Sequence, residues 1–216
     1  MKIIDLTHTI AEDMPVFPGT SQPTLTPAFT IAQHGSAETV LQMFSHTGTH
    51  IDAPAHMIAG APALDNFSVE KFCGPALIVN HPPAAGLSIE LYLLEQMQEK
   101  IKQAEFVLFN TGHSEKWGTK AYFEPFPLLT SAAAEFLISF PLKGVGIDAI
   151  SFDKIHAGAS PIHHILLGAG LILIENLTNL QHIKGEYCLF FALPLKYGQA
   201  DGSPTRAAAI EMETAK

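Results

Sequence analysis

The sequence is poor in thiols and in positive charge, and it has no long apolar run. Its two cysteines, Cys73 and Cys188, show neither a zinc-thiolate spacing nor a disulfide framework, so we expect both to be small buried apolar residues. Only 12 lysines and arginines stand against 21 aspartates and glutamates, for a formal charge of −9, and without a basic patch nucleic acid is a poor candidate partner. No run approaches the roughly 20 apolar residues that cross a bilayer, and the first residues lack the apolar core of a signal peptide. We therefore expect a cytoplasmic protein that binds neither membrane nor nucleic acid.

The chain does contain enough apolar sequence for a substantial core. Its 216 residues fit one large domain, spanning 1–216, better than two. They are 47% hydrophobic and include no low-complexity tract, so disorder is not expected. Charged residues make up only 15% of the chain, which is low for the surface of a monomer. Extensive subunit contacts are one explanation.

Short apolar runs of strand length alternate along the chain with segments of helical pattern. The predicted helices cover residues 88–102, with Ser88 as N-cap, and residues 131–140, ending before Pro141. This alternation predicts a mixed α/β fold. The predicted strands are residues 40–45, 76–80, 106–110, 144–147, 171–175, 187–193 and 205–212.

The most informative segment runs from His46 to His56 and reads HTGTHIDAPAH, with three imidazoles and one carboxylate in eleven residues. Neutral imidazole and carboxylate are the usual ligands of zinc and similar divalent metals. A site with such ligands and no thiolate more often holds a working metal than a structural one. His46 and His50 would share one face of a helix, but Gly48 and Pro54 argue against a helix here. We favour a strand end followed by a tight turn.

A second cluster combines the His163–His164 pair with Glu175. We expect His163 in the loop after Pro161, and Glu175 ends an apolar run in which an unpaired carboxylate would be costly to bury. Five ligands exceed the need of one tetrahedral ion, but they suit two ions bridged by a carboxylate, which can polarise a carbonyl together from about 3.5–4 Å apart. The candidate metal ligands are therefore His46, His50, Asp52, His163 and Glu175.

The segment from His46 to His56 resembles the H-x-G-T-H-x-D-x-P-x-H signature of the metal-dependent cyclase family, which includes bacterial kynurenine formamidases (arylformamidases) and isatin hydrolases. The likeness continues over nearly the whole chain. It includes the opening residues 5–7, the turn at residues 15–19, and later blocks at 146–149, 165–168, 175–177 and 201–206. The resemblance implies a single mixed-sheet domain of the family's swivelling β/β/α type. It also implies an oligomer, so we expect a homo-oligomer, either a dimer or a tetramer.

The resemblance also implies roles for single residues. It assigns His46, His50 and Asp52 to one ion, and Asp52, His163 and Glu175 to a second, with either Asp52 alone or Asp52 and Glu175 together as the bridge. The expected cofactor is zinc, as one or two ions, although manganese also suits such donors.

Two further residues receive roles outside the ligand set. His56 matches the family's catalytic histidine. Kynurenine formamidases place a tryptophan in the Pro-Gly turn against the aromatic substrate, whereas Phe17 stands there in this chain. Phe17 is therefore a candidate substrate contact, with core packing as the alternative. Its ring is smaller and lacks an indole N–H, which weakens the case for N-formylkynurenine.

These observations predict a metal-dependent amidohydrolase acting on the C–N bond of formamides or cyclic amides. Metal-bound hydroxide would attack the carbonyl carbon, and His56 would pass a proton to the leaving nitrogen. One alternative is an isatin-hydrolase-like opening of a cyclic amide. Another is a non-catalytic, metal-stabilised binding protein, against which the intact His56 argues. In each case the partner is a small molecule.

Overall fold

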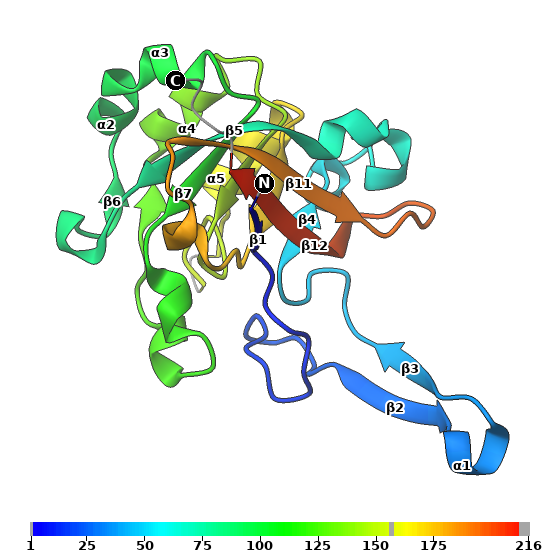
Figure 1. The fold of residues 1–216 in the computed structure, drawn as a ribbon. Coiled ribbons are helices and arrows are strands. Elements are labelled where there is room, and N and C mark those ends of the chain that lie inside the picture. The colour runs from blue at the N-terminus through cyan, green and yellow to red at the C-terminus, as the bar shows by residue number, and fades with distance from the viewer. Residues whose placement is uncertain (1, 156–157, 212–216) are drawn as a thin grey trace.

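The protein is built around a single curved sheet that closes on itself (Figure 1). The structure is a computed structural model that describes residues 2–155 and 158–211. Eight strands follow the order β1-β12-β11-β5-β7-β9-β10-β4, and β4 pairs back onto β12, so the sheet forms a barrel-like ring. The strands are β1 (Ile3–Asp5), β4 (His50–Asp52), β5 (Cys73–Asn80), β7 (Phe106–Asn110), β9 (Gly144–Ile147), β10 (Ile172–Glu175), β11 (Tyr187–Pro194) and β12 (Gly202–Glu211).

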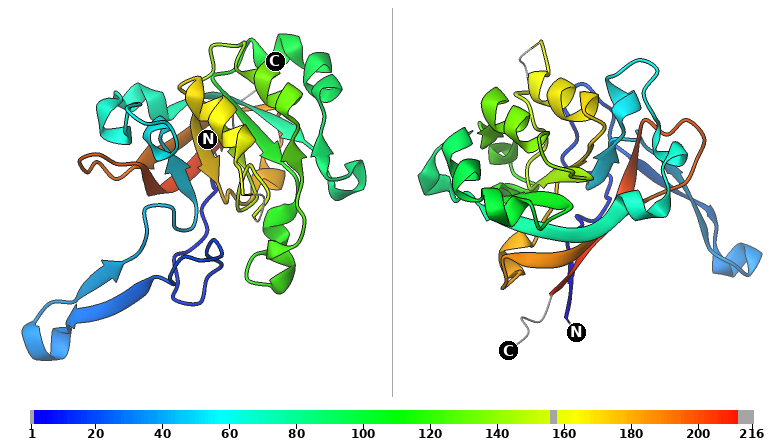
Figure 2. Two further views of the ribbon diagram at one scale, coloured as in Figure 1. Left: turned by 180° about the vertical axis from the view of Figure 1, so that it is seen from behind. Right: turned by 90° about the horizontal axis from the view of Figure 1, so that it is seen from above.

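Helices cover one face of this sheet. Strands β5, β7, β9 and β10 run parallel, and parallel strands need crossover connections. Those crossovers contain α2 (Leu91–Gln96), α3 (Gln98–Ile101), α4 (Ser131–Leu137) and α5 (Pro161–Gly168). Helix α4 packs against both α2 and α5 (Figure 2). The expected mixed α/β fold is confirmed. Within residues 2–155 and 158–211, no helix has the length and apolar character of a membrane span.

Alternating side chains give the barrel two hydrophobic cores. Along β5, Leu77 and Val79 pack under the helices, whereas Ile78 points into the barrel. The interior is tightly filled, because a Cβ on Gly146 would lie 2.6 Å from the Leu108 side chain. This alternation is the period of two expected for strands buried on both faces.

The predicted elements differ from the observed ones mainly at their ends. The strands at 106–110 and 144–147 are confirmed. The predicted N-cap at Ser88 is wrong, because Ser88–Ile89 form a short strand, β6, beside β8 (Leu128–Leu129), and helix α2 begins only after Glu90. Helix α4 stops at Leu137, earlier than expected. Residue 212, the expected last residue of the final strand, lies outside the described residues. Short 3-10 turns occur at Pro54–His56, Leu64–Asn66, Val69–Phe72, Pro83–Ala85, His113–Lys116, Lys120–Phe123 and Leu180–His182.

A hairpin projects far from the main body (Figure 1). It consists of β2 (Thr24–Phe29), α1 (Ile31–His34) and β3 (Glu38–Gln42), and we call residues 24–42 the arm. The strand predicted at 40–45 therefore lies earlier, and it pairs with β2 in a separate two-stranded sheet. Four of its large apolar side chains are exposed: Phe29, Ile31, Val40 and Leu41.

Candidate metal centre

Two neighbouring strands place three of the candidate ligands on one face. Strand β4 runs antiparallel to β10, with Glu175 directly opposite His50. Asp52 lies two residues further along β4 and so shares the face of His50, because side chains alternate along a strand. Ile51 points the other way, into the barrel core. The HxD spacing thus follows from strand geometry. Residues 50–52 form a strand, and the tight turn that was expected in this segment follows it at Pro54–His56.

Helix α5 brings His163 against the same face. His163 was expected in a loop, but it lies in the first turn of α5. The helix begins at Pro161, and the fixed φ of proline suits the first position of a helix. Its Nε2 atom is 3.1 Å from Glu175 Oε1 and 3.6 Å from Asp52 Oδ2. His164 is exposed on the helix, so His163 is the member of the pair that meets the strands.

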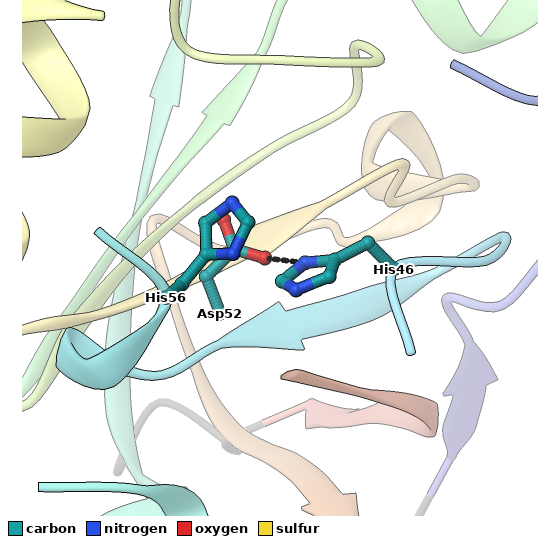
Figure 3. Close-up of side chains that lie close together, drawn as sticks. All are labelled: His46, Asp52 and His56. Atoms are coloured by element: carbon teal, nitrogen blue, oxygen red, sulfur yellow. Dashed lines mark hydrogen bonds and ion pairs between the residues drawn. The ribbon is translucent and has the colours of Figure 1, made fainter. Parts of the chain in front are cut away.

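The other two histidines of the motif lie beside Asp52 (Figure 3). His46 comes from the irregular stretch between the arm and β4, and its Nδ1 is 2.6 Å from Asp52 Oδ1. His56 ends the 3-10 turn Pro54–His56, and its ring centroid is 3.9 Å from that of His46. Ligand atoms of His46, Asp52 and His56 all lie within 4.8 Å of one another, as do those of His50, Asp52 and Glu175. The geometry therefore allows His56 to be either a ligand or a neighbour of the ligands.

Each of the two buried imidazoles is held by one ring nitrogen and presents the other to the carboxylates. His50 Nδ1 is 2.8 Å from the Gly48 carbonyl oxygen, and its Nε2 is 3.2 Å from Asp52 Oδ1. His163 Nδ1 is 2.6 Å from Asp153 Oδ2, and its Nε2 faces the carboxylates. Histidines that bind metals usually donate the other ring N–H to a carbonyl or carboxylate in this way. The donor set therefore fits a divalent metal.

The electrostatics of the site also favour a cation. Asp52 and Glu175 are buried, and among the described residues they pair with histidines and not with lysine or arginine. Burial raises the pKa of Asp52, but hydrogen bonds from His163, His46 and His50 outweigh burial and bring the pKa well below its usual value. Two buried carboxylates are expensive unless positive charge compensates them.

Nearby carboxylates, Asp52 among them, raise the pKa of the imidazoles. Burial lowers the pKa of His163, but Asp153, Asp52 and Glu175 raise it to about 12. His46 behaves similarly, because the effects of Asp52 and Asp201 outweigh burial and raise its pKa to about 9. The site thus attracts protons when it holds no metal.

A cavity of about 430 Å³ opens onto the ligands. Its walls are largely apolar and include Phe44, Met57, Ile150 and Ile155. Phe17 also lines it, from a turn in which the Thr20 N–H donates to the Phe17 carbonyl oxygen at 3.0 Å and Gly19 has a φ of 101°. Small-molecule sites are commonly apolar cavities with a few convergent polar groups. Phe17 therefore lies where a substrate contact is possible, and that contact stays a prediction.

The sequence did not predict two carboxylates, outside the candidate ligand set, that contact the rings of His163 and His46. Asp153 accepts the backbone N–H groups of Ile162 and His163 and contacts the His163 ring. Asp201 Oδ2 is 3.1 Å from His46 Nε2. Asp153 stands in no recognisable motif. Asp201 opens one of the blocks that carry the family resemblance, which was the only signal pointing to it.

Comparisons with known proteins agree with this fold. A family model described as a putative cyclase matches residues 4–154. Kynurenine formamidases from Geobacillus thermodenitrificans and Salinibacter ruber are each 31% identical to this chain, and the alignments cover 97% and 96% of both proteins, respectively. Isatin hydrolase A from Labrenzia aggregata, solved with benzyl benzoate, is similar with a TM-score of 0.88 at 26% identity, over 98% of this chain and 94% of that one. A structure described as a potential metal-dependent hydrolase with cyclase activity has a TM-score of 0.82 at 31% identity, over 99% of both chains.

Proposed function

The chain belongs to the cyclase family, and on that premise we propose that it is a metal-dependent hydrolase of C–N amide-type bonds. The observation that carries the proposal is the convergence of imidazole and carboxylate donors on the wall of an apolar cavity. Relatives and structural neighbours are named for the hydrolysis of a formamide or of isatin, a cyclic amide. We therefore take formamides and cyclic amides as the substrate class.

We assign the metal to the five residues predicted from the sequence: His46, His50, Asp52, His163 and Glu175. Asp52 approaches donors of both clusters, which suits a bridge between two ions. Zinc is our first choice and manganese the second, since nitrogen and oxygen donors suit both. When bound, such a metal activates water and polarises the carbonyl oxygen as a Lewis acid.

His56 is the residue that we assign to proton transfer. It lines the cavity, and burial lowers its pKa, so it is neutral near pH 7 and able to accept a proton. As the water oxygen bonds to the carbonyl carbon, His56 takes the water proton. It then donates that proton to the nitrogen as the C–N bond breaks, so the products are a carboxylic acid and an amine. Phe17 and the other apolar walls orient the organic part of the substrate.

The proposal is tested by metal analysis combined with a turnover screen. The protein is purified without chelator, and its metal content is measured. Hydrolysis of formanilide, N-formylkynurenine, isatin and other cyclic amides is then followed before EDTA treatment, after it, and after zinc or manganese is returned. We expect bound metal and an activity that EDTA removes and metal restores. Metal-free protein with full activity would contradict the proposal, and metal binding without any turnover would favour the binding-protein alternative.

The comparison between substrates also separates the two enzyme hypotheses, hydrolysis of a formamide and opening of a cyclic amide. Turnover of N-formylkynurenine and formanilides above isatin would support the formamidase reading. Preference for isatin would support opening of a cyclic amide, a reading favoured by the high structural similarity to isatin hydrolase A.

The arm supports our proposal that the protein is a homo-oligomer. Its strands expose Phe29, Val40 and Leu41 to solvent, and its only ionisable side chains are those of His34 and Glu38. An isolated two-stranded hairpin is marginally stable in water, and contiguous apolar surface usually marks an interface. A second copy of the chain would cover this surface and explain the low charge content.

A reducing, cytoplasmic location is also part of the proposal. Cys73 and Cys188 are free thiols. Burial raises the pKa of the Cys188 thiol to about 12, so it is unreactive. Unpaired thiols of this kind are typical of proteins kept in a reducing compartment.

A further inference from the structure

His46 differs from the other candidate ligands in how its backbone is held. His50, Asp52 and Glu175 lie in paired strands, and His163 lies in a helix. His46 lies in the irregular stretch between the arm and β4, so no ladder of hydrogen bonds fixes its position. Its ring must therefore be oriented by neighbouring groups if it is to bind a metal.

The start of β12 supplies two such neighbours, Asp201 just before the strand and Gly202 as its first residue. Asp201 Oδ2 is 3.1 Å from His46 Nε2, and the Ser45 hydroxyl donates to the same oxygen at 3.3 Å. Gly202 lies under the ring: a Cβ there would be 2.4 Å from His46 Cε1 and 2.7 Å from Nε2. The φ of Gly202 is outside the left-handed region, so glycine is needed here for space and not for backbone conformation.

Asp201 and Gly202 are themselves hydrogen-bonded to β4 and to the residue that follows it. The Asp201 carbonyl oxygen accepts the Ala53 N–H at 2.8 Å, and Gly202 pairs with Asp52 in the β4–β12 register. Asp52 Oδ1 in turn lies 2.6 Å from His46 Nδ1. The imidazole is thus bounded by Asp52 at one nitrogen, Asp201 at the other and Gly202 beneath.

We propose that Asp201 and Gly202 form a clamp that positions His46 to bind metal through Nδ1. Asp201 accepts the Nε2–H and so selects the tautomer whose free nitrogen faces Asp52. Gly202 leaves the space in which the ring lies. This inference rests on the proposed metal centre and assigns Asp201 and Gly202 as positioning residues, which act through His46 and touch no substrate.

Asp201, the partner of His46, is more open to solvent than Asp153, the partner of His163. The Asp201 side chain is 47% exposed, whereas that of Asp153, the partner of His163, is 7% exposed. Removal of Asp201 should therefore weaken the binding of the ion that His46 contacts and leave the donors around His163 intact.

The test compares four variants with wild type by metal retention under graded chelator, after each protein is loaded with zinc. Asp201→Ala should release its weaker ion at a 10–100-fold lower chelator concentration, the range typical of such outer partners. Asp201→Asn should recover part of the loss, because the amide oxygen can accept the Nε2–H. Gly202→Ala should lose retention because its methyl group displaces the ring. Gly198→Ala is the matched control in the same loop, since its Cβ would meet nothing within 4 Å.

A second readout is the visible spectrum of each protein loaded with Co²⁺, which reports the coordination geometry. We expect Asp201→Ala and Gly202→Ala to change the spectrum and Gly198→Ala to match wild type. Asp201→Ala keeps the backbone bond to Ala53, so it should fold even if Gly202→Ala does not. Wild-type retention and spectrum in Asp201→Ala would overturn the role of Asp201. If wild type binds no divalent metal, the proposed metal centre fails and the clamp fails with it, whereas failure of the clamp alone leaves wild-type binding intact.

Discussion

The metal-free protein should lose stability as the pH rises from about 6.5 to 9. The pKa of His46 is raised from 6.5 to about 9 by Asp52 and Asp201. A group whose pKa is raised by folding stabilises the folded state fully below its unfolded pKa, and this stability is lost as the pH rises through the folded pKa. His163, whose pKa is raised to about 12, contributes with the same sign and continues above pH 9.

The size of the effect follows from the shift. A rise of the His46 pKa from 6.5 to about 9 corresponds to roughly 3 kcal/mol of unfolding free energy. For a chain of this size, each kcal/mol moves the thermal midpoint by about 2–4 °C, so His46 alone should account for a fall of about 10 °C across the window, to which His163 adds with the same sign. Bound metal requires neutral imidazoles, so the stabilisation by metal should grow over the same interval. The curves with and without metal should therefore diverge as the pH rises.

The assay is a thermal melt at several pH values between 6 and 9, with chelator in one series and zinc in the other. His46→Gln should flatten the fall in the metal-free series because it removes one titrating group. His182→Gln, an exposed histidine outside the site, is the matched control and should keep the wild-type slope. The reasoning is refuted if metal-free wild type is as stable at pH 9 as at pH 6.5, or if His46→Gln falls as steeply as wild type.

Three further predictions address the proposed roles. His56→Ala should keep its metal while kcat falls by about 10²–10⁴-fold, and His50→Ala should lose metal; equal metal loss in both would make His56 a ligand. Phe17→Trp should raise kcat/KM for N-formylkynurenine relative to a small formamide, and an unchanged ratio would remove Phe17 from the substrate contacts. Leu41→Lys in the arm should lower the mass measured by light scattering toward that of one chain, whereas Val69→Lys, at an exposed apolar residue elsewhere, should not. An unchanged mass in Leu41→Lys would argue against the arm as the interface.

The buried strands could be predicted from the sequence because their signal is local. Phe106–Asn110 and Gly144–Ile147 are short apolar runs of strand length, and both strands have the predicted bounds. The start of α2 could not be predicted, because Ser88 is a good N-cap by type and only its pairing with distant Leu128 makes it a strand. The strand predicted at 40–45 lies at Glu38–Gln42 for a similar reason. Its apolar residues indicate a strand, but its bounds are set by pairing with β2 in the arm.

The ligands and their outer partners show the same contrast. The HxD pair on β4 was recognisable because two side chains on one strand face have a fixed spacing. Asp153 is ten residues from His163, and Asp201 is 155 residues from His46, so neither contact has a local pattern. The β4–β12 pairing that closes the barrel brings Asp201 to His46, and Asp153 reaches His163 by accepting backbone N–H groups in the first turn of α5. No short segment encodes either arrangement.

The double pairing of β4 has a consequence for how this protein can change. Strand β4 has only three residues, and each is paired with β10 on one edge and β12 on the other. A register slip of one residue would turn His50 and Asp52 into the core and bring Ile51 to the face of the candidate metal centre. With both edges occupied, the strand cannot slide alone. Phe17, by contrast, lies on a turn outside the barrel. On the proposed assignment, substitution in the loops can change substrate contacts, while the proposed ligands on β4 stay fixed in the barrel wall.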